Sequence, residues 1–142
     1  MENQLSTLIN NLQHIGIPVS NITVSEAFYA RFGFQNVMQT IFAFEGETGT
    51  CIMMKKKDSI LELYQMPEKQ LKEIRARNHG HIDHIAFDVD DIDHTFMLLK
   101  KASFNILEEK PVHLPSFWRN GCKYFNILGP DGEKLEFNQI LR

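Results

Sequence analysis

Apolar and polar side chains alternate along several stretches of the chain, a pattern typical of strands with one buried face. Two of these stretches lead into helical patterns, and the two regions match each other. HIGIPVSNITVSEAFYARFGF, from His14 to Phe34, aligns without a gap on HIAFDVDDIDHTFMLLKKASF, from His84 to Phe104. Each copy passes from an alternating stretch into a helix through a Ser, Asn or Asp turn, which can cap the helix. The chain is therefore an internal repeat of a strand, a turn and a helix.

Both predicted helices carry apolar side chains three or four residues apart, so each helix has one apolar face. These side chains are Val24, Phe28 and Phe32 in the first copy and Ile92, Phe96 and Leu99 in the second. Gly33 follows the first helix and is a residue type that commonly ends helices. We expect both apolar faces to pack against a sheet.

The rest of each half contains further strand patterns bounded by turn residues. They cover Gln35 to Phe44, Thr50 to Met54 and Ser59 to Gln65 in the first half, and Phe104 to Leu107, Cys122 to Leu128 and Lys134 to Ile140 in the second. A turn at Gly129 to Gly132 separates the last two, and each half is predicted to be βαβββ. Between the halves, Pro67 to Asn78 is rich in helix formers and predicts a polar linking helix. The lead-in from Leu5 to Leu12 is a weaker pattern that also fits a frayed turn.

Strand alternation decides which side chains share a face, because successive residues point to opposite sides of a sheet. One face is apolar and should pack against the helices; it carries Ile15, Ile17, Val19, Leu61, Leu63, Ile85, Phe87, Val89, Leu135 and Phe137. The other face carries one titratable side chain on each of four strands: His14, Glu62, His84 and Glu136. The repeat pairs the two histidines, and it pairs the glutamates within ILELY and KLEFN. Each of the four alone is an ordinary exposed strand residue, but together two imidazoles and two carboxylates suit a divalent first-row metal ion.

Composition and charge narrow the function further. With 142 residues, 43% of them hydrophobic and 23% charged, the chain has the size and composition of one folded domain. A net charge of −3 excludes the basic surface of a nucleic-acid-binding protein. No apolar run reaches the roughly 18 residues of a membrane span, and the N-terminus lacks a signal-peptide pattern, so we expect a cytoplasmic protein. Cys51 and Cys122 form no CxxC motif and are expected to be reduced, buried thiols.

Five motifs, LQHIGIPV, FYARFGF, SILELY, HIDHIAFDVDDI and GPDGEKLEF, resemble the vicinal oxygen chelate superfamily, which contains glyoxalases, bleomycin resistance proteins and extradiol dioxygenases. The resemblance covers residues 12 to 141 and implies an α+β fold, in which two tandem βαβββ modules form one curved, mixed β-sheet with helices on its outer face. It implies a single domain with module 1 at about residues 12–66, the linking helix at about 67–78 and module 2 at about 82–141. Members of the superfamily are commonly homodimers, so we expect a homodimer here.

Within the superfamily the chain is most similar to glyoxalase I, whose four metal-ligand positions fall on His14, Glu62, His84 and Glu136. The resemblance implies one divalent ion (Zn, Ni, Co or Mn) and a lyase or isomerase that moves a proton beside a carbonyl, through a metal-bound enediolate of a small substrate. Glu136 would be both ligand and base, and Glu62 would return the proton on the opposite face. Glutathione dependence is not expected, because Pro18 and Met66 occupy positions where glyoxalase I has a glutathione-binding arginine and an asparagine.

Two other functions stay open, and in each the partner is again a small molecule. An acyl-CoA epimerase would need a second base, for which Glu45 and Glu47 are candidates, although both also fit a solvated hairpin end. A non-enzymatic binding protein, like the bleomycin resistance proteins, would use a site that usually lacks metal ligands, so the four ligand residues argue against it. The candidate substrate contacts are Tyr64, Trp118, Arg119 and Asn138, of which Trp118 and Arg119 fit packing and surface roles equally well.

Overall fold

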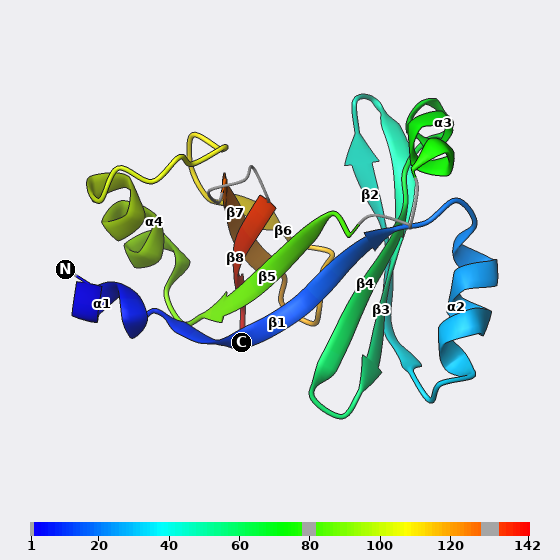
Figure 1. Ribbon diagram of the computed structural model, residues 1–142, viewed down its shortest axis with the longest axis horizontal. Coiled ribbons are helices and arrows are strands. Elements are labelled where there is room, and N and C mark those ends of the chain that lie inside the picture. Colours follow the sequence, from blue (N-terminus) through cyan, green and yellow to red (C-terminus); the bar gives the residue numbers. More distant parts are fainter. Residues whose placement is uncertain (1, 78–81, 129–133) are drawn as a thin grey trace. The chain divides into compact units, whose positions relative to one another are not determined.

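Figure 1 shows the computed structural model, which describes residues 2–77, 82–128 and 134–142. The chain forms two compact units: a first unit, His14–Asp83, and a second unit, Met1–Gln13 together with His84–Arg142. One copy of the sequence repeat therefore lies in each unit. The predicted turn at Gly129 to Gly132 and the predicted end of the linking helix at Asn78 lie outside the described residues.

The first unit contains the end of β1 (Ile9–Pro18), α2 (Ile22–Ala30), β2 (Gln35–Phe44), β3 (Glu47–Lys56), β4 (Ser59–Gln65) and α3 (Glu68–Ala76). Its strands are hydrogen-bonded in the order β2-β3-β4-β1, and β1 and β4 are parallel whereas the other neighbours are antiparallel. The strands predicted at 35–44 and 59–65 and the linking helix are confirmed. The strand predicted at 50–54 is longer, because a tight turn at Glu45 and Gly46, both with positive φ, pairs β2 with β3 as far as Phe44 and Glu47.

The second unit contains α1 (Glu2–Ser6), the start of β1, β5 (His84–Val89), α4 (Ile92–Lys101), β6 (Val112–Leu114), β7 (Cys122–Leu128) and β8 (Lys134–Ile140). Its strand order is β5-β8-β7-β6, and β5 and β8 are the parallel pair. The strands predicted at 122–128 and 134–140 are confirmed.

Two predictions for this second unit are wrong. The lead-in is not a frayed turn, since it supplies α1 and the start of β1, where Asn10 donates hydrogen bonds to Asp88 and Asp90. The strand predicted at 104–107 is a single bridge between Ile106 and Ile127. The chain leaves β7 at Glu108, and the short strand β6 pairs with β7 further along, at Val112–Leu114.

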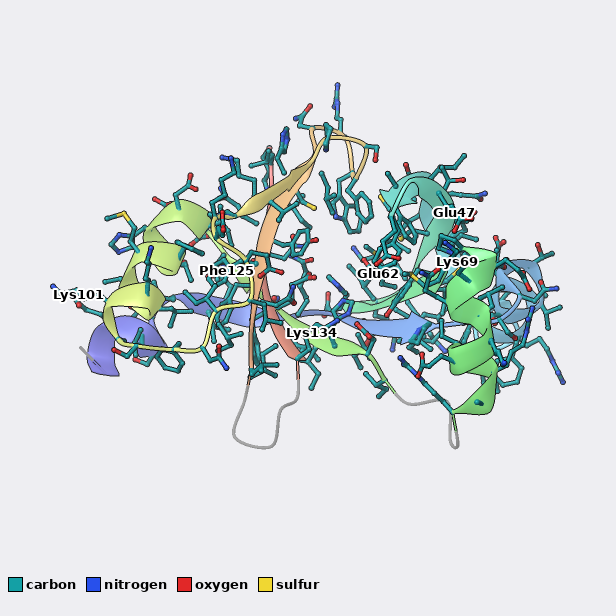
Figure 2. The ribbon with its side chains drawn as sticks, turned by 90° about the horizontal axis from the view of Figure 1, so that it is seen from above. Glu47, Glu62, Lys69, Lys101, Phe125 and Lys134 are labelled. Atoms are coloured by element: carbon teal, nitrogen blue, oxygen red, sulfur yellow. The ribbon has the colours of Figure 1, made fainter. Side chains whose placement is uncertain are left out.

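The core of the second unit is aromatic. Phe125 of β7, labelled in Figure 2, is fully buried. It stacks on Phe137 of β8 at 5.2 Å between ring centroids and meets Phe96 of α4 edge-on at 5.1 Å. Ile92 and Leu99 of α4 belong to the same cluster, so the predicted apolar face of this helix is confirmed. Burial of each such side chain contributes about 1.5–3 kcal/mol to the free energy of unfolding.

The core of the first unit is aliphatic, and it consists of Val19, Ile52, Met54 and Leu63. Helix α2 packs against β3 and β4 (Figure 1), yet none of its residues is fully buried. The apolar face predicted for this helix is wrong, because the side chains on it are largely exposed: Val24 at 65%, Phe28 at 48% and Phe32 at 57%.

The start of α2 explains which face turns inward. The Ile22 N–H donates a 2.8 Å hydrogen bond to Gln65 Oε1 on β4, so the first helical residue lies against the sheet. Ile22 and, two turns later, Tyr29 then pack on the aliphatic cluster. Gly33 has a φ of 89° and follows the helix, as its residue type predicts.

Candidate metal and catalytic site

The four predicted ligands occupy equivalent places in the two units. In each unit the strand that carries the histidine runs parallel to the strand that carries the glutamate. Gly16 pairs with Glu62 in the first unit, and Ala86 pairs with Glu136 in the second. Each histidine lies two residues before the paired residue, and residues two apart on a strand share a face. Each unit therefore places one histidine and one glutamate on the same face of neighbouring strands.

Within each unit the histidine and the glutamate approach closely. His14 Nε2 lies 3.8 Å from Glu62 Oε2, and His84 Nε2 lies 3.7 Å from Glu136 Oε1. The side chain of Glu62 is 14% exposed, and the other three side chains are more deeply buried.

These separations fit metal coordination. They are longer than a hydrogen bond, but shorter than about 4.4 Å, the largest separation of two ligands that each lie about 2.2 Å from one ion. Within the second unit, His84 and Glu136 could each offer a ligand atom to a metal ion. Imidazole nitrogen combined with carboxylate oxygen is a donor set that suits Zn, Ni, Co or Mn.

A chain of buried amides holds Glu136 in the second unit. Asn138 Nδ2 donates to Glu136 Oε2 at 3.0 Å, and Gln13 Nε2 donates to Asn138 Oδ1 at 3.1 Å. Gln13 Nε2 also lies 3.2 Å from Asp88 Oδ1. Asn138, which the sequence offered as a substrate contact, is thus a buried hydrogen-bond partner of a predicted ligand.

Tyr64 occupies the place in the first unit that Asn138 occupies in the second, two residues after the glutamate. Burial raises the pKa of Tyr64 well above its ordinary value, and the charge of Asp83, a hydrogen bond to its carboxylate and the charge of Glu62 raise it further. The phenol therefore stays protonated and acts as a hydrogen-bond donor.

The remaining predicted contacts lie on loops and turns. Trp118 is half-buried in the segment between β6 and β7 and has a φ of 59°, a backbone conformation that is uncommon for a bulky residue. Arg119 beside it is exposed. Glu45 and Glu47 are exposed at the β2–β3 turn, where Figure 2 labels Glu47, and Gln70 donates a hydrogen bond to Glu45.

Gln13 and Asn126 are buried polar residues that the sequence pattern did not single out. Asn126 of β7 lies opposite Glu136 of β8, and its backbone and side-chain nitrogens donate to Glu108 at 2.6 and 2.9 Å. The sequence marks Asn126 only as a single polar residue beside the apolar Ile127 and Leu128 at the end of the strand. The sequence marks Gln13 less clearly, because strand alternation places it on the face opposite that of His14.

Comparison with known proteins places the chain in a family. The profile of the Glyoxalase/Bleomycin resistance protein/Dioxygenase superfamily matches residues 11–137. The chain belongs to this superfamily. The predicted resemblance to vicinal oxygen chelate proteins is therefore confirmed. A relative, the uncharacterized protein YwbC of Bacillus subtilis (strain 168), is 29% identical to this chain over 134 residues. The alignment covers 93% of this chain and 99% of YwbC.

Solved structures share the fold of this vicinal oxygen chelate protein. Methylmalonyl-CoA epimerase from Mycobacterium tuberculosis has a TM-score of 0.75 at 18% identity, over 95% of this chain and 91% of the epimerase. A mutant of 4-hydroxymandelate synthase from Streptomyces coelicolor has a TM-score of 0.70 at 14% identity, over 91% of this chain and 47% of the synthase. These similarities confirm the α+β, vicinal oxygen chelate fold with its mixed strand pairing. Among the described residues, no helix has the length and apolar character that crossing a membrane requires.

Proposed function

We propose that the protein is a metal-dependent, glyoxalase-like enzyme that moves a proton on a carbon beside a carbonyl group of a small substrate. The observation that carries this proposal is the His–Glu pair that recurs in both units with nearly the same separation. His14, Glu62, His84 and Glu136 together would hold one divalent ion, which is Zn, Ni, Co or Mn. The length of chain between Glu62 and His84 permits a site built within one chain or from two.

The ion would act as a Lewis acid that stabilises negative charge on two neighbouring substrate oxygens. Glu136 would remove the proton from the substrate carbon through Oε1 once substrate oxygens replace that oxygen at the ion, because Asn138 holds its other carboxylate oxygen. Glu62 lies at the equivalent position of the repeat and would return the proton on the opposite face of the substrate.

Metal content tests this proposal. Protein purified without added metal and then dialysed against each ion should retain one ion per site by elemental analysis. His84→Ala should lose that ion and keep the fold, because the substitution lies on the face opposite the helix-packed core. His94→Ala is the matched control, since His94 is exposed on α4. Unchanged metal content in His84→Ala would refute the ligand assignment.

A substrate screen tests the reaction class. Dicarbonyls, 2-hydroxy-aldehydes and acyl-CoAs should be compared with the metal-loaded protein, with proton transfer followed by NMR in deuterated water. The glutathione hemithioacetal of methylglyoxal should not be turned over, because the buried Pro18 stands at the position of the glutathione-binding arginine. Robust glutathione-dependent turnover would contradict this expectation.

An acyl-CoA epimerase is the second candidate. Its support is the likeness to structures such as a variant of Streptomyces coelicolor methylmalonyl-CoA epimerase in complex with 2-nitronate-propionyl-CoA. It would need a second base, and the exposed positions of Glu45 and Glu47 at the β2–β3 turn favour a solvated hairpin end instead. Ligand binding by a metal-free protein would favour a third candidate, a non-enzymatic binding protein of the bleomycin resistance type.

We also propose that the protein is a cytoplasmic homodimer. Cys51 and Cys122 are buried thiols, which suits a reducing compartment.

The apolar side chains exposed on α2 offer a surface that a second chain would cover favourably. Sedimentation at micromolar concentration should show a dimer, and a 16.5 kDa species alone would refute it.

A further inference from the structure

We propose that Gln13 and Asn138 are positioning residues that determine which oxygen of Glu136 is presented to a metal ion. This inference rests on the proposed function, because it takes Glu136 to be a ligand. Its basis is the direction of the hydrogen bonds in the second unit. An ionised carboxylate only accepts hydrogen bonds, whereas a side-chain amide has an accepting oxygen and a donating nitrogen.

Gln13 determines how the amide of Asn138 is turned. Gln13 Nε2 lies 3.1 to 3.2 Å from three oxygens, which are Asp88 Oδ1 and both the Oδ1 and the main-chain oxygen of Asn138. Three acceptors around one atom require that atom to be the donating end of the Gln13 amide. Asn138 therefore keeps Oδ1 toward Gln13, so its Nδ2 points the other way, to Glu136 Oε2 at 3.0 Å and Cys122 Sγ at 3.8 Å.

The amide of Asn138 engages one particular oxygen of Glu136. Oε2 accepts the hydrogen bond from Asn138, whereas Oε1 is the oxygen that lies 3.7 Å from His84 Nε2. A hydrogen bond to a charged acceptor is short and directional, so it fixes the carboxylate plane. Glu136 is thereby set to bind an ion shared with His84 through Oε1 alone.

Burial keeps this arrangement in place. Gln13 is 6% exposed and Asn138 is 4% exposed, so water does not readily replace a lost hydrogen bond. Turning the Asn138 amide over would place its oxygen against Glu136 Oε2 and its donors against the donors of Gln13. Asn10 also donates to Asp88, at 2.9 Å, but that bond is exposed and does not involve Asn138.

Gln13→Met tests the proposal, because methionine has nearly the length of glutamine and lacks the donor. Calorimetric titration of Zn²⁺ into the metal-free, full-length variant should give an affinity about 10- to 100-fold weaker than that of the wild type, the usual effect of losing a hydrogen-bonded partner of a ligand. Asn10→Ala is the matched control and should bind Zn²⁺ within about twofold of the wild type. Asn138→Leu removes the same donor to Glu136 independently and should weaken binding to the same extent as Gln13→Met.

Two further measurements separate positioning from a general structural role. In a Glu136→Gln background, Gln13→Met should weaken Zn²⁺ binding no further, because the residue through which it acts is already altered. In metal-free wild-type protein, the Asn138 side-chain amide should give NMR signals protected from solvent exchange, and Gln13→Met should remove that protection.

The outcomes distinguish this inference from the proposed function. Wild-type protein that binds Zn²⁺, together with a Gln13→Met variant of unchanged affinity, would overturn the positioning role alone. An equal loss of affinity in the wild-type and Glu136→Gln backgrounds would also overturn it. Wild-type protein that binds none of Zn²⁺, Ni²⁺, Co²⁺ and Mn²⁺ would overturn the proposed function and the positioning role with it.

Discussion

Helices α2 and α4 begin in the same way but pack differently. In each unit the first helical N–H donates to a strand glutamine at 2.8 to 3.0 Å: Ile22 to Gln65, and Ile92 to Gln139. Further along, Phe96 of α4 enters the aromatic core, whereas the equivalent residue of α2 is Glu26, which accepts a hydrogen bond from Asn36. The two repeats therefore share the anchor of the helix but not the side chain that would bury its centre.

The two predicted glutamate ligands also occupy equivalent positions of the repeat but have different neighbours. Asn138 follows Glu136 by two residues and donates a hydrogen bond to it. Tyr64 follows Glu62 by two residues, but its hydroxyl bonds to Asp83. The repeat thus preserves the candidate His–Glu pair while its surroundings diverge. The hydrogen bond from Asn138 supports the proposed role of Glu136 as the base.

The largest expected effect tests that difference between the glutamates. Glu136→Gln should lower the rate of proton transfer by about 10²- to 10⁴-fold, the usual contribution of a general base. The rate is measured as solvent deuterium exchange at the substrate carbon with metal-loaded protein. Glu45→Gln, at the exposed turn, should leave the rate unchanged, and a large loss there would favour the epimerase alternative. A metal-loaded Glu136→Gln variant that turns over substrate at the wild-type rate would exclude Glu136 as the base.

The next effect tests the aromatic core of the second unit. Phe125→Ala should lower the free energy of unfolding by about 3–5 kcal/mol, because it opens a cavity between Phe96 and Phe137. Met97→Ala on α4 is the control and should change it by at most about 0.5 kcal/mol, since Met97 is 70% exposed. Urea denaturation followed by circular dichroism measures both. A loss below about 1 kcal/mol for Phe125→Ala would contradict the stacked core.

The repeat and the turn residues predicted most of the fold. Strand alternation predicted less, because β3, β7 and β8 each bury runs of adjacent residues. The repeat could also have identified the buried face of α2. Aligning the repeats pairs Ile22 with Ile92 and Tyr29 with Leu99, and the structure packs all four on a core. Spacing alone chose the wrong residues, because α2 carries apolar side chains on more than one face and periodicity does not rank them.

The four candidate ligands followed from local pattern, but their supporting residues did not. Gln13 and Asn138 bond to each other across 125 positions of sequence. Such a contact depends on strand pairing and on side-chain rotamers, which tertiary packing determines. Alternation also places Gln13 and His14 on opposite faces, and both are buried, so burial of one face does not distinguish Gln13.

A smaller effect tests the similarity between the helix starts. Asn21 and Asp91 accept hydrogen bonds from Val24 N and His94 N at 3.1 and 3.0 Å. Replacing either cap with alanine should therefore lower the free energy of unfolding by about 1 kcal/mol. Thermal unfolding of the two variants measures this, and a several-fold larger loss at either cap would show that the two helix starts are not equivalent.

The smallest expected effect concerns the exposed face of α2. In dilute, monomeric protein, Val24→Ala should change the free energy of unfolding by no more than about 0.5 kcal/mol, because Val24 is 65% exposed in the single chain and alanine is the better helix former. Leu99→Ala on α4 is the matched substitution at a buried position and should cost about 2–5 kcal/mol. If Val24→Ala cost more than about 1.5 kcal/mol, Val24 would have to be covered in solution. A melting temperature that rises with protein concentration in the wild type but not in the variant would then identify a second copy of the chain as the cover.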